Sequence, residues 1–102
     1  MTPARIAPRA RREAVEAARW IARDNPAAAR SLQEAIEAAA GRIGRYPRIG
    51  VRRPDLAPAP YRFVQLIGYP YIVVYADDRV PPVIVRIVHA ARDLRRLLRD
   101  LN

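Results

Sequence analysis

The sequence contains no cysteine and no lysine, and His89 is its only histidine. Without cysteine the chain cannot form disulfide bonds, thiolate metal sites or a cysteine nucleophile. A structural zinc site needs several cysteine or histidine ligands, so none is expected here. We therefore predict that the chain binds no metal and no other cofactor.

Long apolar segments are also missing. The longest apolar run, Tyr71 to Ala76, is far too short to cross a bilayer, which takes about 20 residues in a helix. Several arginines stand near the N-terminus, but the apolar segment of a signal peptide does not accompany them. We expect a cytoplasmic protein.

Hydrophobic residues and arginine are abundant instead. Hydrophobic residues make up 51% of the 102 residues, which is typical of a globular chain, and this length predicts one domain over residues 1–102. All 19 basic residues are arginines, and the formal net charge is +9. A charge of this size on a small domain indicates an anionic partner, which could be nucleic acid, an anionic lipid surface or an acidic protein.

The first half of the sequence has the pattern of a helical hairpin. Residues 3–7 could form a short strand, and a helix is predicted from Pro8, where apolar residues begin to recur at steps of three and four. Asp24-Asn25-Pro26 ends this helix and begins a second one, which Tyr46-Pro47 ends. Both apolar stripes are rich in alanine, so the helices can pack closely and antiparallel. Trp20 lies at the edge of the first stripe, and we expect it to pack on the sheet.

The second half has the pattern of a sheet. Residues 47–60 hold four prolines and no periodic pattern, which predicts a connecting loop. From residue 61 the apolar period becomes two, and strands are predicted over residues 61–67, 71–76 and 83–88. The expected product is an antiparallel sheet with helices on one face. Its other face is expected to be open or covered by a partner.

Two arginines interrupt the apolar strands. Strict alternation of side chains along a strand puts Arg62 on the same face as Val64, and Arg86 on the same face as Ile84. If both sets face away from the helices, the two arginines could converge on the open face. His89 would then fall on the opposite face. The other interpretation of Arg86 is structural, with its stem packed on the sheet and its guanidinium group paired with a carboxylate. A lone histidine at the end of a strand is likewise more often a structural hydrogen-bonding residue than a general acid.

The last residues predict a short amphipathic helix. Its leucines are spaced i, i+3, i+4 and i+7, with arginines on the opposite side. A helix of fewer than about 12 residues is marginal in isolation. The leucines must therefore dock on the chain's own sheet or contact a partner.

Six short motifs follow one another along nearly the whole chain. They are Pro8-Arg9-Ala10, Trp20-Ile21-Ala22 followed by Asn25-Pro26, Tyr46-Pro47-Arg48-Ile49-Gly50, Arg53-Pro54-Asp55-Leu56, Tyr61-Arg62 and His89-Ala90-Ala91-Arg92-Asp93. In this order they resemble the ParE-type toxins of the RelE/ParE toxin–antitoxin superfamily. The resemblance implies an α+β fold, in which an N-terminal short strand and a helical hairpin pack on one face of an antiparallel sheet and a short C-terminal helix follows.

The resemblance also implies a small cytoplasmic toxin that a cognate acidic antitoxin holds inactive. ParE-type toxins poison DNA gyrase, whereas RelE-type toxins cut mRNA on the ribosome. Cutting RNA without a metal needs a general base, a general acid and cations that hold the phosphate, and arginine can supply only the cations. RelE relatives rely on lysines, which are absent from this chain. The YoeB-like variety uses a glutamate as its base, and no glutamate follows Glu37 in this sequence. If the chain were such an RNase, its catalytic residues would be Arg62, Arg86 and His89, which form an incomplete set.

We therefore predict a toxin that binds DNA gyrase and has no catalytic residues. Two alternatives stay open, a ribosome-dependent mRNA endonuclease of the RelE/YoeB type and a non-toxic basic nucleic-acid-binding module. The toxin and its antitoxin are expected to form a hetero-oligomer, and no membrane partner is expected. The arginines of the loop are either solvated or part of a contact surface for an anionic partner. The residues expected to bind partners are Arg48, Arg52, Arg53, Arg62, Arg86, Arg92, Leu94, Leu97, Leu98 and Leu101.

Overall fold

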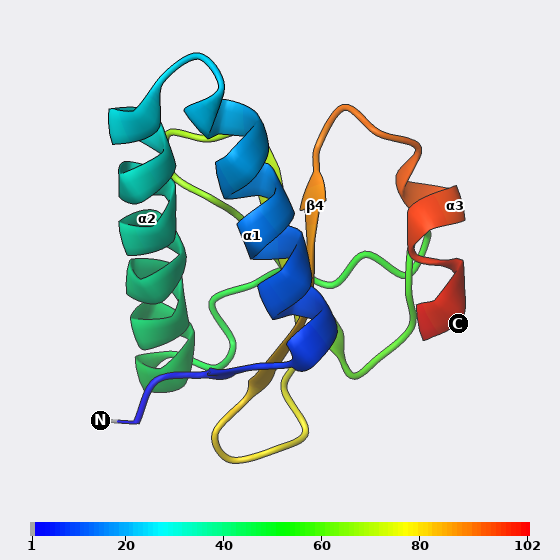
Figure 1. The fold of residues 1–102 in the computed structure, drawn as a ribbon. Coiled ribbons are helices and arrows are strands. Elements are labelled where there is room, and N and C mark those ends of the chain that lie inside the picture. Colours follow the sequence, from blue (N-terminus) through cyan, green and yellow to red (C-terminus); the bar gives the residue numbers. More distant parts are fainter. Residues whose placement is uncertain (1) are drawn as a thin grey trace.

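The structure is a computed structural model that describes residues 2–102. These residues form the predicted α+β fold, with a helical hairpin on one side of a sheet and a short helix on the other (Figure 1). The elements in chain order are β1 (Arg5–Ile6), α1 (Pro8–Ala22), α2 (Pro26–Arg45), β2 (Tyr61–Gln65), β3 (Tyr71–Ala76), β4 (Val83–His89), α3 (Leu94–Leu97) and the 3₁₀ turn η1 (Arg99–Leu101).

The helical hairpin begins at the predicted prolines. Pro8 is the first residue of α1 and Pro26 is the first residue of α2, because proline at this position loses no hydrogen bond. Between the helices, the Asn25 side chain accepts a hydrogen bond of 3.0 Å from the Ala28 N–H and so caps α2. The structure therefore confirms the predicted helical hairpin.

Gly44 allows the N-terminal segment to lie against the end of α2. A Cβ atom at this position would lie 2.2 Å from the Thr2 carbonyl oxygen, which no side chain tolerates. The close approach accompanies a backbone hydrogen bond of 2.9 Å from the Ala4 N–H to the Ala40 carbonyl oxygen. The segment is thereby directed toward the edge of the sheet, where β1 pairs.

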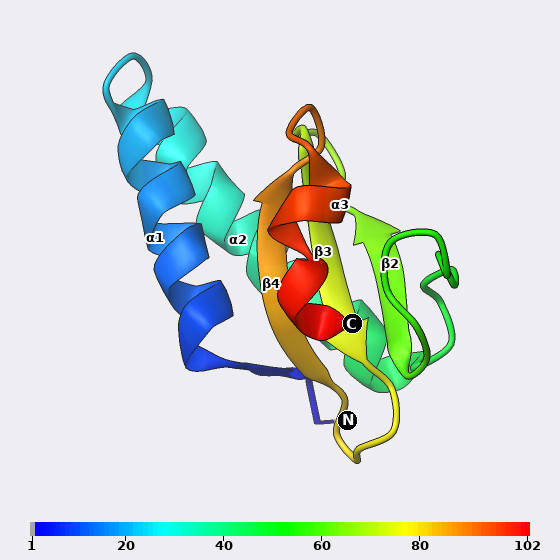
Figure 2. The ribbon, with the colours of Figure 1, turned by 90° about the vertical axis from the view of Figure 1, so that its right-hand side faces the viewer.

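The sheet has four strands in the order β1-β4-β3-β2. β2, β3 and β4 form the predicted antiparallel meander, whereas the two-residue strand β1 pairs with β4 in parallel. Because β1 is so short, most of the outer edge of β4 lies beyond its reach. α1 lies along this edge (Figure 2).

A β-bulge in β4 breaks the predicted alternation. Val74 of β3 pairs with Arg86, but the next residue, Tyr75, pairs with Ile84, so Val85 has no partner. Ile84 therefore faces the helices with Tyr75, whereas Arg86 faces the opposite side with Val74. The prediction that Ile84 and Arg86 share a face is wrong. The extra residue, Val85, shifts the alternation, so that the residues before and after it point to opposite faces.

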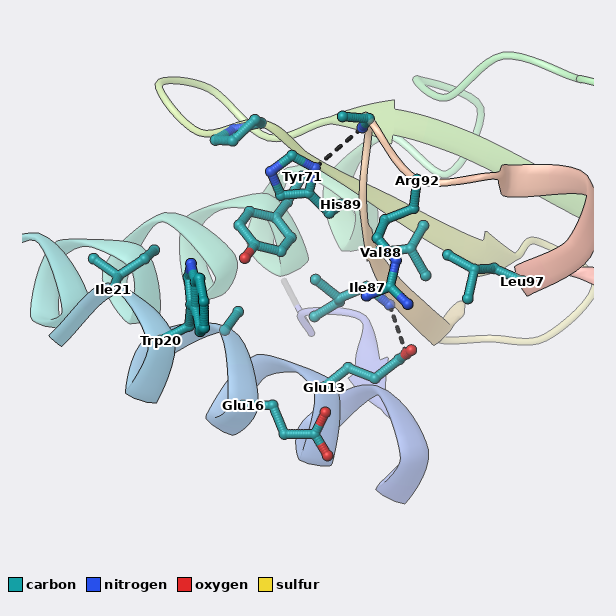
Figure 3. Close-up of a pocket in the computed structure, with 13 residues that line it drawn as sticks. Glu13, Glu16, Trp20, Ile21, Tyr71, Ile87, Val88, His89, Arg92 and Leu97 are labelled. Carbon is teal, nitrogen blue, oxygen red and sulfur yellow. Dashed lines mark hydrogen bonds between the residues drawn. The ribbon is translucent and has the colours of Figure 1, made fainter. Parts of the chain in front are cut away.

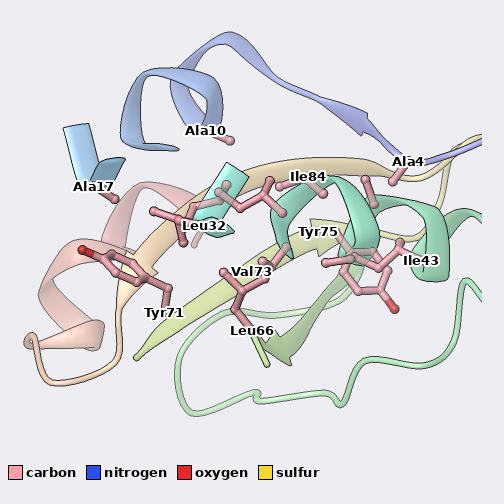
Figure 4. Packing of buried hydrophobic residues seen from close by; sticks show 14 residues of the cluster. Ala4, Ala10, Ala17, Leu32, Ile43, Leu66, Tyr71, Val73, Tyr75 and Ile84 are labelled. Carbon is pink, nitrogen blue, oxygen red and sulfur yellow. The ribbon is translucent and has the colours of Figure 1, made fainter. Parts of the chain in front are cut away.

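The helix-side core fills the space between the hairpin and the sheet (Figure 4). Alanines on α1 and α2 let the helices lie close together, while Leu32, Ile36 and Ile43 of α2 reach the sheet. From the sheet, Val73, Tyr75 and Ile84 meet them with no exposed surface. This core is the one that the two apolar stripes predict.

A second cluster covers the other face of the sheet. Its fully or nearly buried members are Leu56, Ala57, Phe63, Val74, Val88 and Leu98. They come from the connecting loop, the sheet and the C-terminal segment, and Figure 2 shows α3 and the C-terminus lying over β3 and β4. The expectation of an open or partner-covered face is therefore wrong, because the chain's own C-terminal segment covers it.

The C-terminal segment is less helical than predicted. α3 has four residues, and at Leu98 the backbone leaves the helical region (φ −100°, ψ 12°) before η1 begins. The Asp93 side chain caps α3 by accepting a hydrogen bond from the Arg96 N–H. The change of direction at Leu98 places this side chain fully inside the second cluster, while the other three leucines pack around it partly exposed.

Candidate functional site

A groove runs between α1 and the C-terminal segment, over the end of β4 (Figure 3). Its volume is about 730 Å³. One wall consists of the exposed side of α1, and the other consists of the turn after β4 together with Leu97; Tyr71 and Ile87 lie at the base. We name it the α1–α3 groove.

Trp20 projects into the α1–α3 groove (Figure 3). Its side chain is 67% exposed, and the guanidinium carbon of Arg23 lies 5.0 Å from its ring centroid. The prediction that Trp20 packs on the sheet is wrong. The buried stripe of α1 consists of small residues such as Ala10 and Ala17, which bring the helix so close to the sheet that the large ring stays outside. An exposed tryptophan beside a groove is typical of a binding surface.

Arg86 lies at the centre of a buried ionic network, which we name the Arg86 network. Its side chain is 3% exposed. Its Nε and Nη2 atoms donate to the Glu13 carboxylate at 2.8–3.1 Å, and its Nη1 donates to the Leu97 carbonyl oxygen at 2.6 Å and to Asp100 at 3.2 Å. Arg9 of α1 also pairs with Asp100. The network ties α1, β4 and the C-terminal segment together, and it confirms the structural interpretation of Arg86.

Glu13 has a second role in this network. Its Oε1 accepts a hydrogen bond of 3.0 Å from the Ile87 N–H, which lies on the edge of β4 that β1 leaves unpaired. An unpaired strand edge is a template for further strand pairing. The Glu13 carboxylate therefore closes this edge and holds the base of the groove.

Arg62 lies far from this network in the fold, on the edge strand β2. It pairs with Tyr75 across the sheet and so faces the helices, where its Nε donates to Asp77 and its Nη1 donates to the Gly50 carbonyl oxygen at 2.9 Å. Because Arg86 faces the other side of the sheet, the prediction that the two arginines converge is wrong. The bulge in β4 is the physical reason, since it separates the facing of Arg86 from that of Ile84.

His89 ends β4 on the helix side of the sheet, as predicted. Its ring packs edge-on against Tyr71 with 5.1 Å between ring centroids, and its Nδ1 accepts a hydrogen bond of 3.1 Å from the Ala91 N–H (Figure 3). It lines the α1–α3 groove together with Glu16 and Arg92. The three residues of the hypothetical catalytic set thus occupy three separate surroundings, and only His89 opens into the groove.

The arginines of the connecting loop are exposed, and two of them are paired. Arg52 pairs with Asp77 and Arg53 with Asp55, both at 2.9 Å. Hydrogen bonding from Arg53 lowers the pKa of Asp55 below its ordinary value of 3.8. Arg48 makes no ion pair with any residue of the described chain.

The remaining predicted partner-binding residues differ in how accessible they are. Arg92 is exposed on the wall of the α1–α3 groove. Leu94, Leu97 and Leu101 are partly buried, and Leu98 has no exposed surface. In this conformation neither Leu98 nor Arg86 offers surface to a partner.

Sequence reasoning missed the two glutamates of the groove. Glu13 and Glu16 belong to α1 but lie beside residues near the other end of the chain. A weak signal existed, because Glu13 is three residues after Ala10 and four residues before Ala17, a spacing that places it on the same side of α1 as these buried alanines. Across residues 2–102 no three histidine, aspartate or glutamate side chains gather into a group that could hold a metal ion. Nor is any helix in that part of the chain long and apolar enough to cross a membrane.

Comparison with known proteins adds a family to this geometry. Residues 4–94 match the family model described as "ParE toxin of type II toxin-antitoxin system, parDE". No curated protein gives a significant match. The match includes the hairpin, the sheet, the groove-lining residues of α1 and β4, and the first residue of α3.

Proposed function

The chain belongs to the ParE toxin family of type II toxin–antitoxin systems, and we propose that it inhibits growth by binding and poisoning DNA gyrase until a cognate acidic antitoxin neutralises it. Membership of the family implies an antitoxin partner. Gyrase as the target, the cytoplasm as the place of action and a toxin–antitoxin hetero-oligomer are parts of the proposal. The net charge of +9 supports an acidic antitoxin.

The observation that carries binding rather than catalysis is the state of Arg86. A cation that stabilises a cleaved phosphate must be able to reach it. Arg86 is 3% exposed and holds Glu13, Leu97 and Asp100. Its role in holding the fold together leaves no guanidinium surface for RNA.

The α1–α3 groove supports an antitoxin segment as its occupant. Trp20 and Leu97 provide apolar surface on opposite walls, and Arg23 and Arg92 stand near them. A segment with apolar residues toward the groove and acidic residues toward the two arginines would complement both features. Arginine and tryptophan are also the residues that most often dominate the binding energy of an interface.

The endonuclease alternative keeps one supporting observation. His89, Arg92 and Glu16 line the same groove, so a proton-transferring ring, a cation and a carboxylate share one surface. Glu16 is an exposed residue of α1 that was not among the predicted catalytic residues. This set differs from Arg62, Arg86 and His89, and it defines which variant tests the alternative.

The proposal is tested by two assays on the same purified protein. We expect inhibition of gyrase supercoiling or accumulation of cleaved DNA, and no cutting of mRNA on programmed ribosomes. His89→Ala is expected to keep gyrase inhibition, because the His89 ring bonds to the turn after β4 and lines the groove that we assign to the antitoxin.

Codon-positioned mRNA cuts that vanish in His89→Ala would overturn the gyrase proposal and establish the endonuclease. Thermal unfolding of the variant serves as the control, because a merely unfolded protein would lose either activity. Co-purification with the small acidic protein encoded by a neighbouring reading frame would test the antitoxin separately.

A further inference from the structure

The segment Tyr46–Arg53, which we name the β2-edge loop, exposes three large apolar side chains within six residues. Tyr46 is 58% exposed, Ile49 is 45% exposed and Val51 is 58% exposed. Exposed apolar side chains are common singly, but a group of them on one short loop marks an interaction site.

The backbone of the β2-edge loop is held by hydrogen bonds to side chains and backbone of the sheet. The Tyr75 hydroxyl donates to the Pro47 carbonyl oxygen at 2.7 Å and accepts from the Gly50 N–H at 2.9 Å. Arg62 donates to the Gly50 carbonyl oxygen at 2.9 Å. Val51 exchanges two backbone hydrogen bonds, of 2.8 and 3.0 Å, with Phe63 of β2. The loop therefore presents its side chains on a fixed backbone.

Gly50 shows how close this support is. A Cβ atom at Gly50 would lie 2.8 Å from a ring carbon of Tyr75 and 3.0 Å from the Cβ of Arg62. Tyr75 itself has no exposed surface and belongs to the helix-side core. The core thus fixes the shape of the loop, and a loop that is already ordered loses little conformational entropy when a partner binds.

The charge around the exposed side chains is positive. Arg45 and Arg48 flank Tyr46, both are exposed, and neither pairs with an acid among residues 2–102. The only carboxylate of the connecting loop, Asp55, is already paired with Arg53. The surface combines an apolar centre with unpaired arginines, which fits a protein surface of apolar and acidic side chains.

A nucleic acid fits this surface less well. Single-stranded binding sites use aromatic platforms on which successive bases stack, whereas this loop exposes one aromatic ring, that of Tyr46, beside the branched aliphatic side chains of Ile49 and Val51. These two side chains gain nothing from phosphate groups and would be covered well by a protein.

The β2-edge loop and the α1–α3 groove lie at opposite edges of the sheet. β2 is one edge of the sheet, and β1 with the open part of β4 forms the other. Val51 bridges to β2, whereas the groove lies over β4 and α1. A segment seated in the groove would leave the β2-edge loop uncovered.

We propose that the β2-edge loop is the surface through which the toxin contacts its protein target, at a site where acidic side chains flank an apolar contact. This inference rests on the proposed function, and purified DNA gyrase is the probe. The antitoxin contact is assigned to the groove at the other edge of the sheet.

The test compares Ile49→Glu with Ile67→Glu. Ile67 is 73% exposed in the turn between β2 and β3, so both variants place a glutamate on an exposed turn and lower the net charge equally. We expect Ile49→Glu to weaken gyrase binding by about tenfold or more, which is typical of an interface anchor. Ile67→Glu should leave the affinity within about twofold, which is typical of a contact outside the interface core. Both variants should bind the antitoxin as the wild type does.

Each other outcome has a definite meaning. Wild-type protein that does not bind gyrase overturns the proposed function and this inference with it. Wild-type binding that Ile49→Glu leaves intact overturns only the inference. Loss of antitoxin binding in Ile49→Glu, with gyrase binding kept, would assign the loop to the antitoxin and also overturn it. Arg48→Glu provides a second variant at an exposed side chain, and it should weaken gyrase binding in the same direction.

Discussion

The two faces of the sheet are covered in unequal ways. On one face, α1 and α2 pack against the sheet through a large apolar cluster. On the other face, part of the connecting loop and a short segment after β4 cover the sheet, and Leu98 is the residue of that segment with no exposed surface. The second face is also held by the ionic network around Arg86, whose side chain is 3% exposed.

We infer that the helix-side core mainly determines stability, whereas the covering of the other face mainly determines the shape of the proposed binding site. The helix-side core has the larger apolar area and should determine the stability of the fold. The C-terminal segment has few apolar anchors, so its attachment depends on the Arg86 network and on Leu98. Because this segment also forms one wall of the α1–α3 groove, its attachment sets the shape of the proposed antitoxin site.

The strongest test compares two leucines with no exposed surface, one from each face. Leu32→Ala should lower the free energy of unfolding by about 4–5 kcal/mol, because α2 and the sheet cannot move together to fill the cavity. Leu98→Ala should cost about 2–3 kcal/mol, because a short terminal segment can shift to close the space. Urea unfolding of both variants measures the difference. Equal losses would show that the two faces contribute alike.

The next test concerns the Arg86 network. Arg86→Ala should cost about 3–4 kcal/mol, because it leaves the partly buried Glu13 carboxylate without its partner. Arg9→Ala is the matched control, since it removes the pair with Asp100 whose side chains are 50% and 45% exposed, and it should cost less than about 1 kcal/mol. Thermal unfolding would give both values. A loss in Arg9→Ala as large as that in Arg86→Ala would contradict the central role of Arg86.

A smaller effect should come from the hydroxyl group of Tyr75, a residue of the helix-side core with no exposed surface. Tyr75→Phe should cost about 1–2 kcal/mol, because the Gly50 N–H and the Pro47 carbonyl oxygen lose their partner. Burial also raises the pKa of Tyr75 above its ordinary value of 10.0. The folded protein then keeps this proton more tightly than the unfolded chain, so stability that is present below about pH 10 is lost as the pH rises further.

Unfolding measured between about pH 9 and pH 11 tests this sign, because the linkage acts only above the unfolded pKa. The wild type should lose more stability over this range than Tyr75→Phe. Tyr71→Phe serves as the comparison, because burial raises the pKa of Tyr71 as well but its hydroxyl does not hold the loop. A Tyr75→Phe protein with the full alkaline loss would contradict the assignment.

The smallest effect on stability should come from Trp20, which lines the α1–α3 groove between the helical hairpin and the C-terminal segment. Trp20→Ala should change the free energy of unfolding by less than about 0.5 kcal/mol, since the ring is largely exposed. Antitoxin affinity should nevertheless fall by about tenfold or more. Val15→Ala, at an exposed position on the same helix, should change neither. Unchanged antitoxin affinity in Trp20→Ala would remove the antitoxin from the groove.

The sequence by itself determined the elements and the family. Proline at the start of each helix, Asn25 as a cap and the apolar period of α2 are local signals that act within a few residues. The period of two after residue 60 likewise predicted β2, β3 and β4. The paired state of Arg86 was one of two interpretations, because a charged group in an apolar strand must find a partner.

Only the tertiary structure decided which groups meet. Glu13 is 73 residues from Arg86, and no local pattern identifies such a partner. The bulge at Val85 is a feature of how β4 pairs with β3, and it places Arg86 on the face opposite to Ile84 and Arg62. The fate of the C-terminal leucines was equally open, because their spacing shows that they must be buried but not against what. Burial depends on the shape of the surface available, and that surface exists only once the sheet has formed.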